Sequence, residues 1–211
     1  AGAIERLGLD AEPGMVLASM GIYTFRPGVM KKMLDRTPYI DFGKEVIPAA
    51  IEERRVYAFC ENTYWRDIGT IRSFHDANIE LTQPLPALNL YSPDFPIFTH
   101  PRFLPGVKIN QCEIHQSIVC DGSIISGSRV ADSIVGVRAV IDGGSMIERS
   151  IIMGGTMFRG DRRDRSELPL GIGPDCHIRN AIIDLDAHIG AGCRLVNEQG
   201  IQDADDEHYC I

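Results

Sequence analysis

The feature that most constrains the fold is the spacing of apolar residues in the second half of the chain. From residue 114 onward, isoleucine, valine or leucine recurs at intervals of five or six residues. Neither the 3.6-residue period of a helix nor the two-residue period of a strand gives this spacing, whereas a hexapeptide β-helix does. The thirteen residues of the series are Ile114, Val119, Ile125, Val130, Val135, Ile141, Ile147, Ile152, Ile172, Ile178, Ile183, Ile189 and Leu195. Because three short strands make one coil, the series predicts about four coils of a parallel β-helix, in a domain at residues 107–211.

One break interrupts the series, at residues 154–171, where four arginines lie among acidic residues. A β-helix tolerates an insertion that leaves and re-enters at one corner, and such loops often carry a binding face. A solvated loop of mixed charge explains the same composition, so both interpretations stay open. An antiparallel sandwich is disfavoured for the domain as a whole, because it requires period-two alternation.

The first 82 residues follow the pattern of an α/β domain that has too few strands to close one. Residues 15–25 are apolar, with β-branched and aromatic members, and predict a mostly buried strand; residues 56–60 predict a second, short one. Helices are expected at residues 27–36, at 44–55 and from a Thr70 cap to about residue 81. We therefore expect residues 1–82 to be the C-terminal portion of a larger domain. Six prolines at residues 83–106 then predict a stiff, extended linker.

The charge and the cysteines exclude several classes of protein. A net charge of -8 and a pI near 5.2 argue against non-specific binding to nucleic acid, which needs clustered lysine and arginine. No apolar run approaches the roughly 20 residues of a membrane helix, so no membrane association is expected. The six cysteines form no C-x-x-C pair. Reduced thiols and a cytoplasmic location are therefore expected, or a plastid if the source is a plant.

The densest polar and aromatic cluster is at residues 64–70, which hold the only tryptophan of the chain. Asp67 lies in a loop just ahead of a predicted helix, where a carboxylate suits a Mg²⁺ ion that is shared with substrate phosphates. Capping the helix, or pairing with Arg66, is the ordinary alternative. Ser19 lies in the first predicted strand beside a glycine and is placed to hydrogen-bond a sugar, although a buried serine bonded to backbone is the commoner case.

Five stretches of the sequence resemble glucose-1-phosphate adenylyltransferase (ADP-glucose pyrophosphorylase), in that family's order and with near-family spacing. They are LASMGIYTF, DFGKEVIPAAI, YWRDIGTIRSFHDAN, PIFTHPRFLPGVKI and IGPDCHIRNAIID. The resemblance runs from about residue 15 to the C-terminus. It implies a left-handed β-helix that follows part of a Rossmann-like nucleotidyltransferase domain. It also implies an enzyme that makes ADP-glucose and pyrophosphate from ATP and glucose 1-phosphate, for glycogen or starch synthesis.

The resemblance also assigns roles to residues of the catalytic half. It implies that Asp67 is the second of two aspartates that hold the catalytic Mg²⁺ ion. Ser19 matches the serine that contacts the glucose moiety, and Trp65 and Arg66 match positions that line the site.

The resemblance further implies a tetramer that is regulated by an anionic effector. Arg102 matches an arginine of the effector pocket, and Arg179 lies in the stretch that carries basic effector-binding residues. Leu185 stands where plant-type relatives carry a lysine, which removes one phosphate partner and leaves the identity of the effector open. A plain ion pair at a domain interface is the alternative role for Arg102.

Parts of the family's pattern fall outside this sequence. The nucleotide-binding loop, the first metal aspartate and the Glu-Lys pair for the sugar phosphate would precede residue 1, and the last coil would follow residue 211. We therefore expect the 211-residue chain alone to be catalytically inactive. A non-catalytic regulatory or assembly module is one alternative function. A hexapeptide acyltransferase is another, because His115, His177 and His188 lie in the repeats and such enzymes use a histidine at a coil edge as general base.

Overall fold

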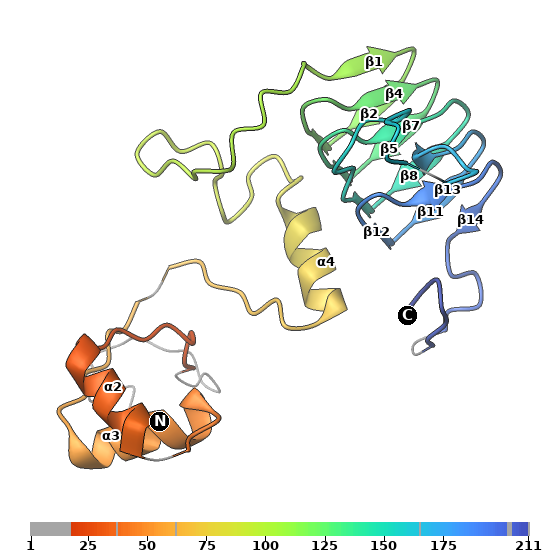
Figure 1. Ribbon diagram of the computed structural model, residues 1–211. Helices are drawn as coiled ribbons and strands as arrows, with labels where there is room; N and C mark the ends of the chain where they lie inside the picture. The colour runs from red at the N-terminus through yellow and green to blue at the C-terminus, as the bar shows by residue number, and fades with distance from the viewer. Residues whose placement is uncertain (1–17, 37, 62, 165, 202–203, 211) are drawn as a thin grey trace. The chain divides into compact units, whose positions relative to one another are not determined.

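The computed structural model describes residues 18–36, 38–61, 63–164, 166–201 and 204–210 (Figure 1). The chain divides into two compact units between Asp67 and Ile68, and each unit is described by itself. No helix among the described residues is long and apolar enough to cross a membrane.

The first unit is helical in its described part. Helix α2 (Pro27–Arg36) starts at the predicted proline, whose fixed φ suits the first turn of a helix. The π-helical turn η1 (Phe42–Val46) is capped by the side chain of Asp41 and continues directly into α3 (Ile47–Glu53). Pro48 lies in the first turn of α3, where it breaks no intrahelical hydrogen bond. The two predicted helices of this unit are thus confirmed.

The two strands expected in this unit are not formed. Residues 18–25 are irregular and mostly exposed, residues 56–60 are irregular and exposed, and residues 15–17 lie outside the described part of the chain. A strand is stable only when its backbone groups are paired, and the described residues of this unit supply no partner strand. The buried core here consists of Met33, Val46 and Ala50.

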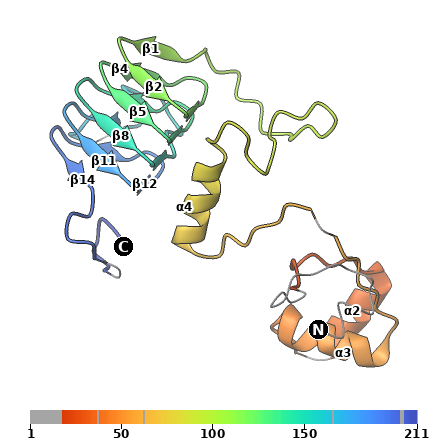
Figure 2. The same ribbon diagram turned by 180° about the vertical axis from the view of Figure 1, so that it is seen from behind.

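The second unit contains a parallel β-helix whose strands form three sheets along its length (Figures 1 and 2). The first sheet is β1 (Lys108–Asn110), β4 (Ile124–Ser126), β7 (Val140–Ile141), β10 (Gly171–Ile172) and β13 (His188–Ile189). The second sheet is β2 (Glu113–His115), β5 (Arg129–Ala131), β8 (Met146–Glu148), β11 (His177–Arg179) and β14 (Arg194–Leu195). The third sheet is β3 (Ile118–Val119), β6 (Ile134–Val135), β9 (Ile151–Ile152) and β12 (Ile182–Ile183).

The β-helix has about five turns, one more than the spacing predicted. The difference arises at its start, because β1 precedes the first residue of the apolar series and contains Ile109, five residues before Ile114. Ile109 fits the interval but is 51% exposed. The series itself is confirmed: its members in the middle turns are fully buried and stack from turn to turn in register. Those with 0% exposure are Ile125, Val130, Val135, Ile141, Ile147, Ile172 and Ile178.

Buried serines satisfy the backbone at one corner of the β-helix. The N–H of Ser150 donates to Ser133 Oγ at 3.0 Å, and the N–H of Ala181 donates to Ser150 Oγ at 3.2 Å. Ser150 Oγ in turn donates to the carbonyl of Glu148 at 2.7 Å. Since a buried N–H without a partner is costly, this ladder explains why serine can replace an apolar residue at these buried positions.

Helix α4 (Ile71–Glu80) belongs to the same unit as the β-helix. The predicted Thr70 cap is confirmed, and Ser73 completes a capping box. The helix packs on β9, on the outside of the third sheet (Figures 1 and 2). Ile151 of β9 is 4% exposed and Ile79 of α4 is 3% exposed, so the contact is apolar.

The insertion at residues 153–170 leaves the β-helix after β9 and re-enters at β10, as predicted. Arg159 holds it to the body of the β-helix, because Nη1 lies 2.9 and 2.8 Å from the two carboxylate oxygens of Asp142. His188 Nδ1 lies 2.7 Å from the carbonyl oxygen of Leu168. Thr156 of the insertion also hydrogen-bonds the carboxylate of Asp186 through its N–H and its Oγ1, so several contacts tie the insertion to the β-helix.

Candidate functional site

The loop at residues 64–69 leads directly into α4. Trp65 is 43% exposed, and Arg66 and Asp67 are also exposed. The cap of the helix is Thr70, whose Oγ1 accepts the N–H of Ser73 at 3.1 Å. Asp67 therefore does not cap α4, which removes that alternative role for it. The three predicted site residues are consecutive and lie on an open surface loop.

Asp67 is the residue predicted to supply one carboxylate to a magnesium site. Among the residues that the structure describes, no three histidine, cysteine, aspartate or glutamate side chains gather where they could hold a metal ion. A protein usually holds Mg²⁺ through only one or two carboxylates, and substrate phosphates and water complete the shell. The described residues thus offer a hard oxygen ligand at Asp67 but not a complete metal-binding cage.

Ser19 is exposed, so the alternative of a buried serine bonded to backbone is wrong. Its Oγ accepts the N–H of Gly21 at 3.2 Å and lies 3.1 Å from the hydroxyl of Tyr23. Both hydrogen bonds are local. Gly21 has a φ of 71°, a conformation that glycine adopts without strain. The turn holds the serine hydroxyl at the surface, where a sugar could reach it.

Of the two arginines predicted to bind the effector, Arg102 lies in the irregular segment before β1 and Arg179 is the last residue of β11. Arg102 is exposed, and its Nη1 donates to the carbonyl of His100 at 3.5 Å. Burial and the charge of Asp121 raise the pKa of the Cys120 thiol, whereas the charge of Arg102 lowers it. Arg179 is exposed at the end of β11, in register with Glu148 of β8.

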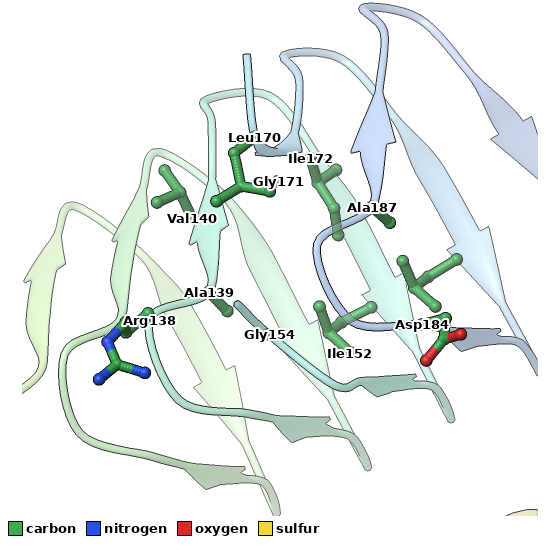
Figure 3. A pocket seen from close by; sticks show the side chains of 11 residues that line it. Arg138, Ala139, Val140, Ile152, Gly154, Leu170, Gly171, Ile172, Asp184 and Ala187 are labelled. Atoms are coloured by element: carbon green, nitrogen blue, oxygen red, sulfur yellow. The ribbon is translucent and has the colours of Figure 1, made fainter. Parts of the chain in front are cut away.

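A small cavity lies where the insertion re-enters the β-helix (Figure 3). Leu170, Ile172 and Ile152 line it, with Arg138 and Asp184 at its sides. The space open to a water-sized molecule is about 10 Å³, which is room for about one water. This cavity is too small to be a substrate or effector site.

Several charged residues in the described part of the insertion are engaged with one another or with the β-helix. Hydrogen bonds from Arg163 lower the pKa of Asp161 to about 2, and Arg159 is paired with Asp142. Arg138 lies over the ring of Phe158, 5.4 Å from its centroid. These pairings favour a structural role for the insertion over a binding face.

Two of the three histidines of the repeats take part in structural contacts. His188 lies against Leu168 through Nδ1, and its Nε2 is 3.6 Å from Asp164. His177 Nε2 is buried 3.7 Å from a carboxylate oxygen of Glu148. A general base needs a ring nitrogen that a substrate can reach. The geometry of these two histidines therefore argues against an acyltransferase site.

The contact between α4 and the β-helix was not predicted from the sequence; in it, His75 Nε2 lies 2.7 Å from the carbonyl oxygen of Arg149. A signal for it was present. Each strand of the third sheet is a pair of apolar residues whose second member fills the core, so the first member faces outward. A sheet that is apolar on both faces needs a cover. The pairs are Ile118–Val119, Ile134–Val135, Ile151–Ile152 and Ile182–Ile183.

Two protein-family models match this chain. The model described as the GLGC left-handed parallel beta-helix domain matches residues 102–211, which is more than half of the chain. The model described as nucleotidyl transferase matches residues 10–84. The two matches confirm a left-handed β-helix that follows a nucleotidyltransferase segment, and they lie in the predicted order.

Proposed function

Because the chain belongs to the family of the GLGC left-handed parallel β-helix domain, we propose that it acts as part of an ADP-glucose pyrophosphorylase. A nucleotidyl transferase segment followed by this β-helix is the architecture of that enzyme. The second match shows a nucleotidyl transferase segment at residues 10–84. The finer assignment, to ATP and glucose 1-phosphate and to glycogen or starch synthesis, is the proposal.

The observation that carries the proposal is the YWRDIGT loop with an exposed carboxylate immediately ahead of a capped helix. In the proposed reaction, a phosphate oxygen of glucose 1-phosphate attacks the α-phosphorus of ATP in line. A new P–O bond forms, the bond between the α-phosphorus and its bridging oxygen breaks, and pyrophosphate leaves. Such a reaction needs mainly positioning and charge stabilisation.

Each predicted site residue has a role that its chemistry allows. Asp67 supplies one carboxylate ligand to Mg²⁺, which neutralises phosphate charge when it is bound. The hydroxyl of Ser19 hydrogen-bonds the glucose moiety, and Trp65 and Arg66 line the site. Arg66 adds a positive charge beside Asp67, where anionic phosphates would gather.

The proposal extends to regulation and assembly. Arg102 and Arg179 are proposed to bind an anionic effector. The assembly is proposed to be a tetramer, located in the cytoplasm or, in a plant, in a plastid. A regulatory or assembly subunit without catalysis is the competing function, and activity of the full-length gene product separates the two.

The proposal is tested with the purified full-length gene product, glucose 1-phosphate, MgCl₂ and one nucleoside triphosphate at a time. We expect ADP-glucose and pyrophosphate with ATP, and a kcat/KM at least about tenfold lower with UTP, CTP or dTTP. UDP-glucose as the preferred product would overturn the assignment to ATP. No transfer with any of the four would favour the non-catalytic function.

A further inference from the structure

Helix α4 is fastened to the β-helix by a polar contact as well as by apolar packing. His75 Nε2 lies 2.7 Å from the carbonyl oxygen of Arg149. A carbonyl oxygen can only accept a hydrogen bond, so His75 must donate from Nε2. Arg149 stands at a corner with a φ of 45°, and its N–H donates to the carbonyl of Ala131 at 3.0 Å. The acceptor is therefore held by the β-helix ladder.

The same corner continues into the next turn of the β-helix. Arg149 Nε donates to Asn180 Oδ1 at 3.1 Å, and the N–H of Asn180 donates to the carbonyl of Glu148, also at 3.1 Å. Asn180 directly follows Arg179, for which an effector contact is proposed. Arg179 is therefore the sequence neighbour of Asn180, whose side chain accepts a hydrogen bond from Arg149. The carbonyl of Arg149 is in turn the acceptor for His75 of α4.

The other end of α4 leads to the proposed catalytic residue. In the capping box, Thr70 Oγ1 accepts the N–H of Ser73 and Ser73 Oγ accepts the N–H of Thr70, both at 3.1 Å. The cap fixes the direction in which the chain enters the helix. Asp67 lies only three residues before Thr70, so there is little slack between the carboxylate and the helix.

We infer that His75 is a positioning residue that couples the loop at residues 64–69 to the third and fourth turns of the β-helix. The inference rests on the function proposed for Asp67. The hydrogen bond to Arg149 sets where α4 lies on the third sheet, and α4 sets where the loop ends.

The structural half of the inference is tested without any enzyme assay, by hydrogen–deuterium exchange on the 211-residue chain. In His75→Ala we expect amides of residues 64–82 to exchange about tenfold faster, the size expected when one hydrogen bond is lost. Amides of the β-helix strands keep their wild-type rates. His115→Ala, an exposed histidine on β2, is the matched control and leaves residues 64–82 unchanged. Wild-type exchange of residues 64–82 in His75→Ala would overturn the inference.

The functional half is tested by kinetics of the full-length gene product. His75→Ala is expected to lower kcat about tenfold while KM for ATP and for glucose 1-phosphate stays unchanged, because the residue positions a catalytic group without touching substrate. His75→Gln, whose amide can donate from a similar position, restores most of kcat. Asn180→Ala lowers kcat in the same direction, and the double variant His75→Ala/Asn180→Ala is no slower than His75→Ala alone.

Two results would contradict the coupling: an unchanged kcat in His75→Ala, or additive losses in the double variant. A wild-type protein that makes no ADP-glucose would instead refute the proposed function. The exchange experiment would then still decide whether His75 holds α4 and the loop in place.

Discussion

At the scale of single residues, the β-helix leaves no room for a side chain at some of its corners. A Cβ atom at Gly136 would lie 2.2 Å from the carbonyl oxygen of Met153, and one at Gly154 would lie 2.1 Å from that of Val137. Adjacent turns therefore meet backbone to backbone at this corner. The glycines there are required by close approach as much as by backbone conformation.

Gly136→Ala is accordingly predicted to destabilise the β-helix by about 1–3 kcal/mol, because backbone atoms must move apart to admit the methyl group. The free energy of unfolding, measured in urea by far-ultraviolet circular dichroism, checks this. Gly106→Ala is the matched control, since nothing lies within 4 Å of a Cβ at that position. Equal midpoints for the two variants would show that the corner is not tightly packed.

Some residues of the candidate site could be predicted from their sequence neighbours, and others could not. Asp67 and Thr70 were recognised because a carboxylate before a capped helix is a local pattern, and the cap is confirmed. Ser19 was placed in a buried strand because its neighbours are apolar, but an apolar run forms a strand only if partner strands exist. His75 was missed, because its acceptor is a carbonyl 74 residues away in the sequence.

At the scale of elements, the insertion behaves as a tethered part of the β-helix. Arg159 is bound to both carboxylate oxygens of Asp142, and its Nε donates to the carbonyl of Leu170 at 2.6 Å. Charge-assisted hydrogen bonds of this kind are stronger than neutral ones. The insertion should therefore open locally much less often than an untethered surface loop.

Arg159→Ala is predicted to expose the insertion to proteolysis. We expect chymotrypsin to cleave after Phe158 about tenfold faster than in wild type, because the loss of the charge-assisted bonds allows local opening. Arg162→Ala, an exposed arginine of the same loop, should be cleaved at the wild-type rate. Equal cleavage rates for the two variants would mean that the tether does not hold the loop.

The elements also show how far a repeat can be read from sequence. Five- and six-residue spacing predicts the β-helix because every turn makes the same contacts with the next one. The pattern of a single turn therefore specifies the whole stack. The spacing also includes Ile109, which opens the first turn but was not counted in the series; its side chain is half-exposed at the end of the stack. The packing of α4 on the third sheet was not predicted. The core uses only the second residue of each apolar pair, and the first residue is covered by a helix that lies outside the repeats.

At the scale of the whole molecule, the two compact units differ in the size of their cores. The described part of the first unit buries three hydrophobic residues in its cluster, whereas the core of the β-helix buries eleven. Because burial of apolar surface is the main stabilising contribution, the first unit of the 211-residue chain should unfold at lower denaturant concentration than the β-helix.

Unfolding of the 211-residue chain in urea is therefore predicted to show two transitions. The fluorescence of Trp65, the only tryptophan, reports on the first unit, and far-ultraviolet circular dichroism follows the β-helix. Ile147→Ala, a substitution of a fully buried core residue, should lower the free energy of unfolding of the β-helix by about 2–5 kcal/mol. Only the urea midpoint of the second transition should therefore fall. Coincident transitions by both probes would indicate a single cooperative unit.

The central claim is that this family member catalyses nucleotidyl transfer with Asp67 as a metal ligand, and a comparison of two carboxylate variants tests it most directly. In the full-length gene product, Asp67→Asn is predicted to lower the kcat of ADP-glucose formation by about 10²-fold or more, because a ligand that helps stabilise phosphate charge is lost. Asp94→Asn, at an exposed aspartate of the proline-rich linker, should retain the wild-type rate. A wild-type kcat in Asp67→Asn would contradict the account.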